Sequence, residues 1–196
     1  MIVLASQSKA RRALLTAAGI DAVIEPAALD EGEIKRRVRG EGGTTERCAT
    51  ELAAAKAARV SQKNPDALVI GADQILDCSG AWFDKPRDLA EARGQLRALR
   101  GRTHELVSAV TVARDDKNLW GHVARARLMM RPFSDAFLDD YVAAMGERLC
   151  ETVGGYALEG LGAQLFERVE GDYFSILGLP LLPLLAFLRE EGAVPR

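Results

Sequence analysis

The chain has 196 residues, of which 48% are hydrophobic and 28% are charged, and its formal net charge is -2. This length suits a single domain that buries a substantial core. The near balance of 26 basic and 28 acidic residues argues against a non-specific nucleic-acid binder, which needs a basic surplus, but leaves room for a small polyanionic ligand.

Apolar runs and helical patterns alternate through the first half of the chain. Short, fully apolar runs indicate buried strands, whereas apolar residues that recur every three or four positions indicate helices. The clearest helix is rich in alanine and opens with threonine caps. The elements expected here are a strand over 2–5, a helix over 11–18, a strand over 23–25, a mobile loop or frayed short helix over 29–43, a helix over 45–62, a strand over 67–72 and a helix over 88–100.

The second half of the chain contains more paired strands. Early alternation of strands and helices, followed by hairpins, predicts an α/β protein with a mixed sheet in two lobes and not a pure doubly wound sheet. The elements expected here are a strand over 106–113, a turn over 115–118, a partner strand that runs toward 131, a helix over 134–144, a glycine-rich loop over 151–162, a hairpin of strands over 165–169 and 173–177, and a helix over 180–191.

The cysteines and the apolar stretches bear on the cellular compartment. Cys48, Cys78 and Cys150 are odd in number and lack CxxC spacing, so a closed disulfide framework is excluded and a reducing cytoplasm fits. The N-terminal apolar run is too short for a signal peptide. The most apolar stretch, residues 176–188, is shorter than the roughly 20 residues of a membrane helix and contains prolines. We therefore expect a cytoplasmic protein without a membrane span.

The first candidate site follows the first strand and opens the first helix, in the sequence Ser6-Gln7-Ser8-Lys9-Ala10-Arg11-Arg12. Unpaired amides at a helix N-terminus suit a phosphate. The hydroxyls of Ser6 and Ser8 and the guanidinium of Arg11 add donors that match phosphate oxygens. The alternative is that Ser8 only caps the helix.

Asp73 stands where the buried strand over 67–72 is expected to end, a position that faces the ligand crevice in open α/β sheets. A carboxylate there suits a divalent metal and an attacking water, although Asp73-Gln74 is also typical of a plain turn. Lys56 and Lys85 are compact cations that suit phosphate, yet each on its own is more typical of a solvated surface. Lys85 precedes Pro86, which holds it extended.

Several other chemistries are disfavoured. His104 and His122 do not form an HExxH arrangement, so a zinc site is not expected. His104 also has no serine or cysteine partner by spacing, and neither a P-loop nor a GxSxG elbow is present. The glycine loop over 153–162 lacks the setting of a dinucleotide fingerprint, but its backbone can approach a base closely.

Eight motifs follow one another between Leu4 and Leu181: ASxSxxR, Asp30-Glu31, LAxxKA, GADQ, Lys85-Pro86, GRTH, GGYxxEGxG and GLPL. In this order they resemble the Maf family of nucleotide pyrophosphatases across nearly the whole chain. The resemblance implies a single Maf-like nucleotide pyrophosphatase domain over 1–196, with two lobes around a central cleft as in the house-cleaning ITP pyrophosphatases. It also implies hydrolysis of a nucleoside triphosphate to the monophosphate and pyrophosphate, with Mg or Mn.

The resemblance also assigns roles to matching residues. It implies that Asp73 is the proton acceptor and that Glu31 assists at the metal, so both carboxylates would bind the cation. Lys56 and Lys85 would complete the catalytic set beside the triphosphate. The residues expected to bind the substrate are Ser6, Ser8, Arg11, Gln74 and Glu159.

Gln74 and Glu159 resemble the branch of the family that acts on 7-methyl-GTP, whereas the branch that acts on dTTP and UTP has threonine and glutamine at these places. The carboxylate of Glu159 would accept hydrogen bonds from a guanine edge and offset the positive charge of a methylated base. Ala10 replaces the arginine of the dTTP/UTP branch and also the bulky aromatic residue of the 7-methyl-GTP branch. The preferred base therefore stays open.

A non-catalytic regulator is the alternative from another class, because the family has been associated with inhibition of septum formation. A protein that only binds would not need Asp73 and Glu31 together with two lysines, so catalysis is favoured. The expected partner is a nucleoside triphosphate, with no nucleic acid and no membrane. A homodimer is left open, because dimers are common in such folds.

Overall fold

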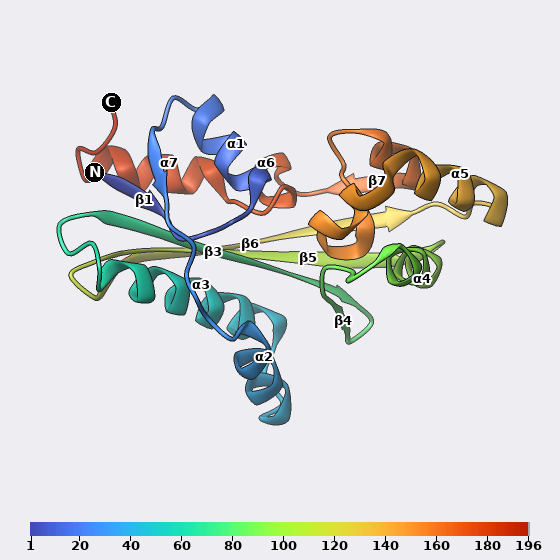
Figure 1. Ribbon diagram of the computed structural model, residues 1–196, viewed down its shortest axis with the longest axis horizontal. Helices are drawn as coiled ribbons and strands as arrows, with labels where there is room; N and C mark the ends of the chain where they lie inside the picture. The colour runs from blue at the N-terminus through green and yellow to red at the C-terminus, as the bar shows by residue number, and fades with distance from the viewer. Residues whose placement is uncertain (196) are drawn as a thin grey trace. The chain divides into compact units, whose positions relative to one another are not determined.

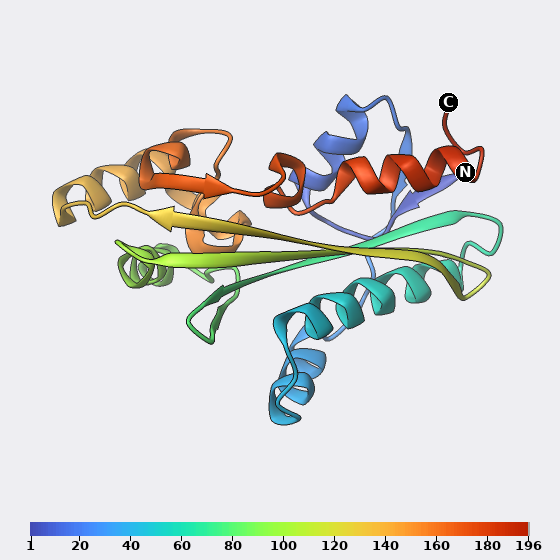
Figure 2. The same ribbon diagram turned by 180° about the vertical axis from the view of Figure 1, so that it is seen from behind.

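Seven strands form one sheet in the computed structural model, which describes residues 1–195 (Figures 1 and 2). Most elements lie close to the ranges expected from the sequence. In chain order they are β1 (Ile2–Leu4), α1 (Lys9–Ala17), β2 (Ala22–Ile24), α2 (Glu31–Gly40), α3 (Thr45–Ser61), β3 (Leu68–Cys78), β4 (Ala81–Phe83), α4 (Leu89–Leu99), β5 (Thr103–Arg114), β6 (Lys117–Met130), α5 (Asp135–Met145), the 3₁₀ turns η1 (Gly146–Glu151), η2 (Val153–Gly155) and η3 (Leu161–Leu165), β7 (Phe166–Glu170), α6 (Tyr173–Ile176) and α7 (Leu181–Glu190).

The strand order is β2-β1-β3-β5-β6-β7, and β4 pairs with β3. β1 runs parallel to both of its neighbours, with Leu4 opposite Ile24 of β2 and Ile70 of β3. β4 is antiparallel to β3, and β7 is antiparallel to β6. The sheet is therefore mixed, which confirms the α/β architecture expected from the sequence.

The chain divides into two compact units. Unit 1 contains Met1–Gln74, Val107–Ala124 and the segment that begins at Asp172, whereas unit 2 contains Ile75–Leu106 and Arg125–Gly171. β3, β5 and β6 each contribute residues to both units. The two units agree with the two lobes expected from the sequence.

β1 and the first half of β3 are buried on both faces. Ile2 and Leu4 belong to a core cluster that also contains Leu184 and Leu188 of α7, whereas Val3 and Val69 pack with Val60 of α3. Side chains alternate along a strand, so two buried faces produce the continuous apolar runs seen in the sequence. Figures 1 and 2 show α3 on one side of these strands and α1 and α7 on the other.

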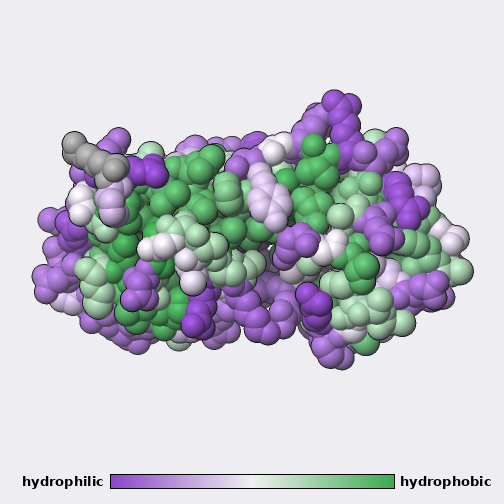
Figure 3. Space-filling view, turned by 90° about the horizontal axis from the view of Figure 1, so that it is seen from above, coloured by the Kyte–Doolittle hydropathy of each residue, from purple (hydrophilic) through white to green (hydrophobic). Residues whose placement is uncertain are grey.

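Helix α7 reads LLPLLAFLRE and is apolar over most of its length. Leu184 and Leu188 are fully buried, whereas Leu182 is 57% exposed. Hydrophobic residues (green) accordingly gather in the left part of Figure 3, which views unit 1 from the side of α7. Within residues 1–195, no helix combines the length and the hydropathy needed to cross a membrane.

Unit 2 contains α4, α5 and the three 3₁₀ turns, together with β4 and β7. Leu96 of α4 and Leu138 of α5 are completely buried. Gly154 and Gly155 have φ of 76° and 69°, a region that glycine enters without steric cost. A Cβ on Gly154 would lie 2.6 Å from the side chain of Leu76. The glycine-rich loop expected over 151–162 is therefore a series of tight turns that pack into this unit.

The hairpin expected over 165–169 and 173–177 is wrong in its second strand, because residues 173–176 form the short helix α6. Asp172 caps this helix, and its carboxylate accepts a hydrogen bond from the Ser175 amide at 2.7 Å. Gly171 has a φ of 127°, which turns the chain before the helix begins. β7 pairs with β6 instead.

The expected end of the strand over 67–72 is also wrong, because β3 continues to Cys78. Its last residues pair with β4, a short strand that the sequence analysis does not predict. Asp73 and Gln74 therefore lie inside a strand and do not form a plain turn. Of the two alternatives for residues 29–43, a mobile loop or a short helix, the structure has the helix, α2. Asp30 caps this helix, and its Oδ1 accepts a hydrogen bond from the Glu33 amide at 3.1 Å.

Candidate active site

The candidate site lies in unit 1, along the part of β3 that continues past β1. β1 pairs with β3 only as far as Leu4 and Ile70, after which the chain leaves the sheet and forms α1. Asp73 and Gln74 follow in β3 and point to opposite faces, because side chains alternate along a strand. Asp73 contacts α3, whereas Gln74 contacts the backbone of α6.

Lys56 of α3 is held between two carboxylates. Its Nζ lies 2.6 Å from Oδ1 of Asp73 and 2.7 Å from Oε1 of Glu31. The side chains of Lys56 and Asp73 are only 8% and 7% exposed, whereas that of Glu31 is 43% exposed. The surface alternative for Lys56 is therefore wrong: its ammonium group belongs to a buried ion cluster.

Gly71 allows α3 to approach β3 closely enough for this cluster to form. An added Cβ would collide with the carbonyl oxygen of Ala53 and would lie 2.6 Å from the amide nitrogen of Ala57. Lys56 lies between these two alanines in α3. The glycine and the alanines thus set the separation at which Lys56 reaches Asp73.

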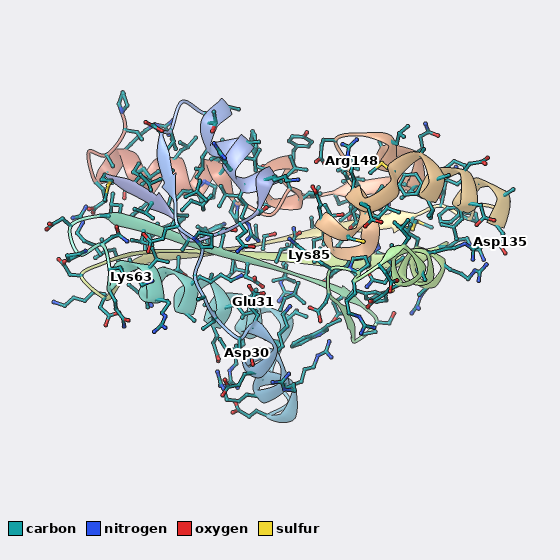
Figure 4. All side chains as sticks on the ribbon, in the orientation of Figure 1. Asp30, Glu31, Lys63, Lys85, Asp135 and Arg148 are labelled. Carbon is teal, nitrogen blue, oxygen red and sulfur yellow. The ribbon has the colours of Figure 1, made fainter. Side chains whose placement is uncertain are left out.

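Glu31 is the first residue of α2 and is labelled there in Figure 4. Burial raises the pKa of this carboxyl, but the charge and hydrogen bond of Lys56, with Lys35 and Arg11, lower it by more. The net pKa of Glu31 therefore lies below the ordinary value of 4.5. A negative charge is also favoured in the first turn of a helix. Glu31 is an ionised carboxylate at neutral pH.

The second oxygen of Asp73, Oδ2, is buried and has no hydrogen-bond partner among residues 1–195. An unpaired buried polar atom costs about 1–3 kcal/mol, so this oxygen is suited to contact a ligand. The same described residues contain no cluster of three or more His, Cys, Asp or Glu side chains that would hold a metal by themselves. Two carboxylates fit Mg²⁺ nonetheless, because this ion commonly uses one or two carboxylates together with substrate phosphates.

Arg11 is buried, and its guanidinium donates to the backbone of two other segments of unit 1. Nε donates to the carbonyl of Gly178 at 2.7 Å, and Nη1 donates to the carbonyl of Ala72 at 2.9 Å. Burial lowers the pKa of Arg11, while Asp73 and Glu31 act in the opposite direction. An arginine stays charged under these conditions, so Arg11 fixes a positive charge near the two carboxylates.

Ser6 and Ser8 shape the loop before α1. Ser6 Oγ accepts hydrogen bonds from the Ser8 amide and from Nη1 of Arg11, both at 3.2 Å. Ser8 Oγ accepts from the Arg11 amide at 3.4 Å and is the N-cap of α1, as the capping alternative predicts. Each serine oxygen accepts in these contacts, so each hydroxyl keeps its hydrogen to donate.

Lys85 and Glu159 belong to unit 2. Lys85 follows β4, is exposed and is labelled in Figure 4. Glu159 is exposed in the segment between η2 and η3. The other expected site residues lie together in unit 1: Ser6, Ser8, Arg11, Glu31, Lys56, Asp73 and Gln74.

His104 is a buried neutral residue of unit 2. Its Nε2 lies 2.8 Å from the hydroxyl of Tyr156, and its ring is 6.0 Å from that of Phe166 between centroids. Burial lowers the pKa of His104 to about 4. The imidazole therefore anchors Tyr156 in the glycine-rich segment.

Three residues that contact the expected site are missed by the sequence analysis. Ser108 and Ser175 hold the side chain of Gln74, and Gly178 accepts from Arg11. Ser108 lies in an apolar strand and carries no signal of its own. Gly178 lies in the GLPL motif and has a φ of 95°, so a requirement for glycine is the signal that would have found it.

The profile of one protein family, described as Maf-like protein, matches residues 1–191. The chain belongs to the Maf family. This confirms the resemblance that the eight ordered motifs predict.

A relative from Granulibacter bethesdensis, named nucleoside triphosphate pyrophosphatase, is 54% identical over 98% of this chain and 98% of its own length. A Maf-family relative from Rhizobium meliloti, named 7-methyl-GTP pyrophosphatase, is 47% identical over 99% of this chain and 98% of its own length. Another with the same name, from Brucella abortus, is 48% identical over 98% and 97%.

Proposed function

We propose that the chain is a nucleoside triphosphate pyrophosphatase, which hydrolyses the bond between the α and β phosphates and releases a monophosphate and pyrophosphate. The observation that carries the proposal is the buried cluster in which Lys56 lies 2.6 Å from Asp73 and 2.7 Å from Glu31. Relatives named nucleoside triphosphate pyrophosphatase and 7-methyl-GTP pyrophosphatase, at 54% and 47% identity, support it.

Asp73 is proposed to position the attacking water and to accept its proton. Lys56 holds Oδ1 at 2.6 Å and so fixes the orientation of the carboxylate. Oδ2 is buried without a partner among residues 1–195 and is the oxygen available to a ligand. General-base catalysis of this kind contributes about 10²–10⁴-fold to the rate.

Asp73 and Glu31 are also proposed to hold a divalent cation, Mg or Mn. Both supply the oxygen atoms that these ions prefer, and Lys56 neutralises part of their charge before a cation binds. When bound, the cation would offset charge on the phosphate oxygens at the bond that breaks.

The triphosphate is proposed to contact the N-terminus of α1, where the helix dipole favours an anion and the hydroxyls of Ser6 and Ser8 can donate hydrogen bonds. Arg11 acts mainly through its fixed positive charge, because its Nε and Nη1 are used by backbone carbonyls. Lys85 supplies a further cation to the phosphates. These groups bind the substrate and also stabilise the negative charge that develops on pyrophosphate as it leaves.

For the base, Gln74 and Glu159 favour 7-methyl-GTP. The carboxylate of Glu159 suits a guanine edge and a positively charged methylated ring. Two of the relatives described above carry the name 7-methyl-GTP pyrophosphatase, and the third carries the general name. A dTTP/UTP pyrophosphatase is the alternative within the same enzyme class.

A free nucleotide, and not a nucleic acid, is the proposed ligand, because the formal net charge is -2. The cytoplasmic location and the homodimer stay predictions. A non-catalytic nucleotide-binding regulator of septum formation is disfavoured by the buried Lys56–Asp73 pair, since binding alone does not require it.

The test is pyrophosphate release by the purified protein with Mg or Mn, across 7-methyl-GTP, GTP, dTTP and UTP. We expect release, with the highest kcat/KM for 7-methyl-GTP. Preference for dTTP or UTP would move the chain to the other branch and keep the enzyme class. Nucleotide binding without any pyrophosphate release would favour the regulator.

A further inference from the structure

The side-chain amide of Gln74 has one fixed orientation. Its Nε2 lies 2.9 Å from Oγ of Ser108, 3.1 Å from the carbonyl oxygen of Ser175 and 3.0 Å from that of Ile176. Carbonyl oxygens only accept hydrogen bonds, so the nitrogen of the amide must face them. A rotated amide would place its oxygen against two carbonyl oxygens. The N–H donors of the Gln74 amide are therefore used by acceptors of the protein itself.

Ser108 sets the direction of the hydrogen bonds in this network. Its Oγ donates to the carbonyl of Ser175 at 2.7 Å, and a hydroxyl has one hydrogen, so the same oxygen accepts from Gln74. Ser108 and Ser175 are 1% and 3% exposed. Asp172 holds Ser175 in turn, accepting from its amide at 2.7 Å and from its hydroxyl at 2.6 Å. A buried network in which each donor has its acceptor is rigid.

The same arrangement leaves Oε1 as the group that Gln74 can offer to a ligand. All three hydrogen bonds of the Gln74 side chain are made by Nε2. Oε1 accepts none from residues 1–195. Gly178 borders it: an added Cβ there would lie 3.8 Å from Oε1 and 3.5 Å from Nη2 of Arg11. The absence of a side chain on Gly178 keeps open the space beside both groups.

We propose that Ser108 and Ser175 are positioning residues that make Gln74 a hydrogen-bond acceptor only, so that the site selects a base that donates a ring N–H to Oε1. The inference rests on the proposed function and deepens it. The bases that meet this condition carry a ring N–H beside a carbonyl oxygen, as guanine, uracil and thymine do and adenine and cytosine do not. Among them, the proposed preference for 7-methyl-GTP selects the guanine type. Ser108 and Ser175 act through Gln74 and do not themselves touch the substrate.

The first experiment compares the preferred guanine-type triphosphate with its derivative methylated at the ring N–H. We expect the unmodified protein to favour the N–H form in kcat/KM by at least about tenfold, because the methyl group removes the hydrogen that Oε1 is proposed to accept. In Gln74→Leu the two substrates should agree within about threefold, since the acceptor is gone. A preference that persists in Gln74→Leu would assign the recognition to another residue and overturn the proposal.

The second experiment tests the positioning role with Ser108→Ala and a matched control, Ser61→Ala. Ser61 is also a fully buried serine of unit 1, and its Oγ accepts from the Asp116 amide at 3.1 Å. Ser108→Ala should reduce the N–H preference severalfold through KM, with a smaller change in kcat. Ser61→Ala should lose comparable stability and keep the preference. An equal loss for both substrates in Ser108→Ala would show a purely structural role.

A double variant connects the two results. In the Gln74→Leu background, Ser108→Ala should have no further effect on the N–H preference, because Ser108 acts only through Gln74. An additional loss of preference there would contradict the inference. If the unmodified protein released no pyrophosphate from any triphosphate, the proposed function itself would fail, whereas release with an unchanged preference in Gln74→Leu would overturn the inference alone.

Discussion

Gly71 of β3 and Ala53 of α3 lie closer together than any side chain on Gly71 would allow. An added Cβ would collide with the carbonyl oxygen of Ala53. This close packing sets the height of α3 above the sheet and places Nζ of Lys56 2.6 Å from Asp73. The separation of one helix from one strand is thus part of the proposed active site.

Gly71→Ala should push α3 away from β3 and weaken the contact between Lys56 and Asp73. Overpacking of this kind costs about 1–3 kcal/mol, so denaturant unfolding should show a loss of that size and pyrophosphate release should fall. Gly94→Ala is the control, because Gly94 is an exposed residue of α4 with nothing within 4 Å of an added Cβ. That variant should gain about 0.5–1 kcal/mol and keep its activity. Equal behaviour of the two variants would refute the close-packing role.

Asp73→Asn should reduce kcat by about 100-fold or more while the fold is retained, because an amide is a poor proton acceptor. Asp77→Asn is the matched control on the same strand. Asp77 Oδ1 accepts from the Gly80 amide at 2.8 Å, and an asparagine oxygen can accept the same bond. Steady-state kinetics give the kcat of each variant, and circular dichroism checks that each variant is folded. Near-normal turnover in Asp73→Asn would show that its assigned role is wrong.

The pH dependence of stability should carry a contribution from His104. Burial lowers its pKa from 6.5 to about 4, so between these values the unfolded chain binds a proton that the folded protein does not. His104 therefore adds stability above pH 6.5 that is lost as the pH falls toward 4, on the order of 3 kcal/mol in total.

His104→Gln keeps a partner for Tyr156 and does not titrate. Its free energy of unfolding should fall less steeply between pH 6.5 and 4 than that of the unmodified protein. Parallel profiles for His104→Gln and the unmodified protein would count against a buried neutral imidazole.

Metal removal should abolish pyrophosphate release without unfolding the protein. Lys56 already provides a counterion for both carboxylates, so the fold does not depend on a cation. Treatment with a chelator should leave the thermal midpoint unchanged, and added Mg or Mn should restore activity. Full activity in the presence of excess chelator would exclude the proposed metal role.

Glu159→Gln should change the preference among bases more than it changes phosphate chemistry. The substitution removes a negative charge from the exposed loop of unit 2 but keeps its size. The kcat/KM ratio of 7-methyl-GTP to GTP should fall, because the methylated ring loses the partner for its positive charge. An unchanged ratio would remove Glu159 from base recognition.

Much of unit 1 could be predicted from the sequence because β1 and the first half of β3 are buried on both faces and therefore read as continuous apolar runs. The burial of Lys56 also had a signal: it lies four residues after Leu52 and eight after Cys48, both fully buried, so the three share one face of α3. A lysine on an apolar helical face indicates a buried ion pair more than a solvated surface.

Other features depend on contacts that no local pattern contains. Residues 173–176 have aromatic and β-branched side chains typical of a strand, but the cap at Asp172 makes them a helix. The orientation of Gln74 depends on Ser108 and Ser175, which are 34 and 101 residues away in the chain. Such hydrogen bonds decide which half of an amide faces a ligand only after the fold has formed.

The most direct test of the central claim is to identify the products of the purified protein with 7-methyl-GTP and Mg. Hydrolysis between the α and β phosphates predicts 7-methyl-GMP and pyrophosphate in equal amounts, with both formed about 100-fold or more slowly by Asp73→Asn. Release of orthophosphate and a diphosphate would place the cut at the other anhydride bond and contradict the proposed function.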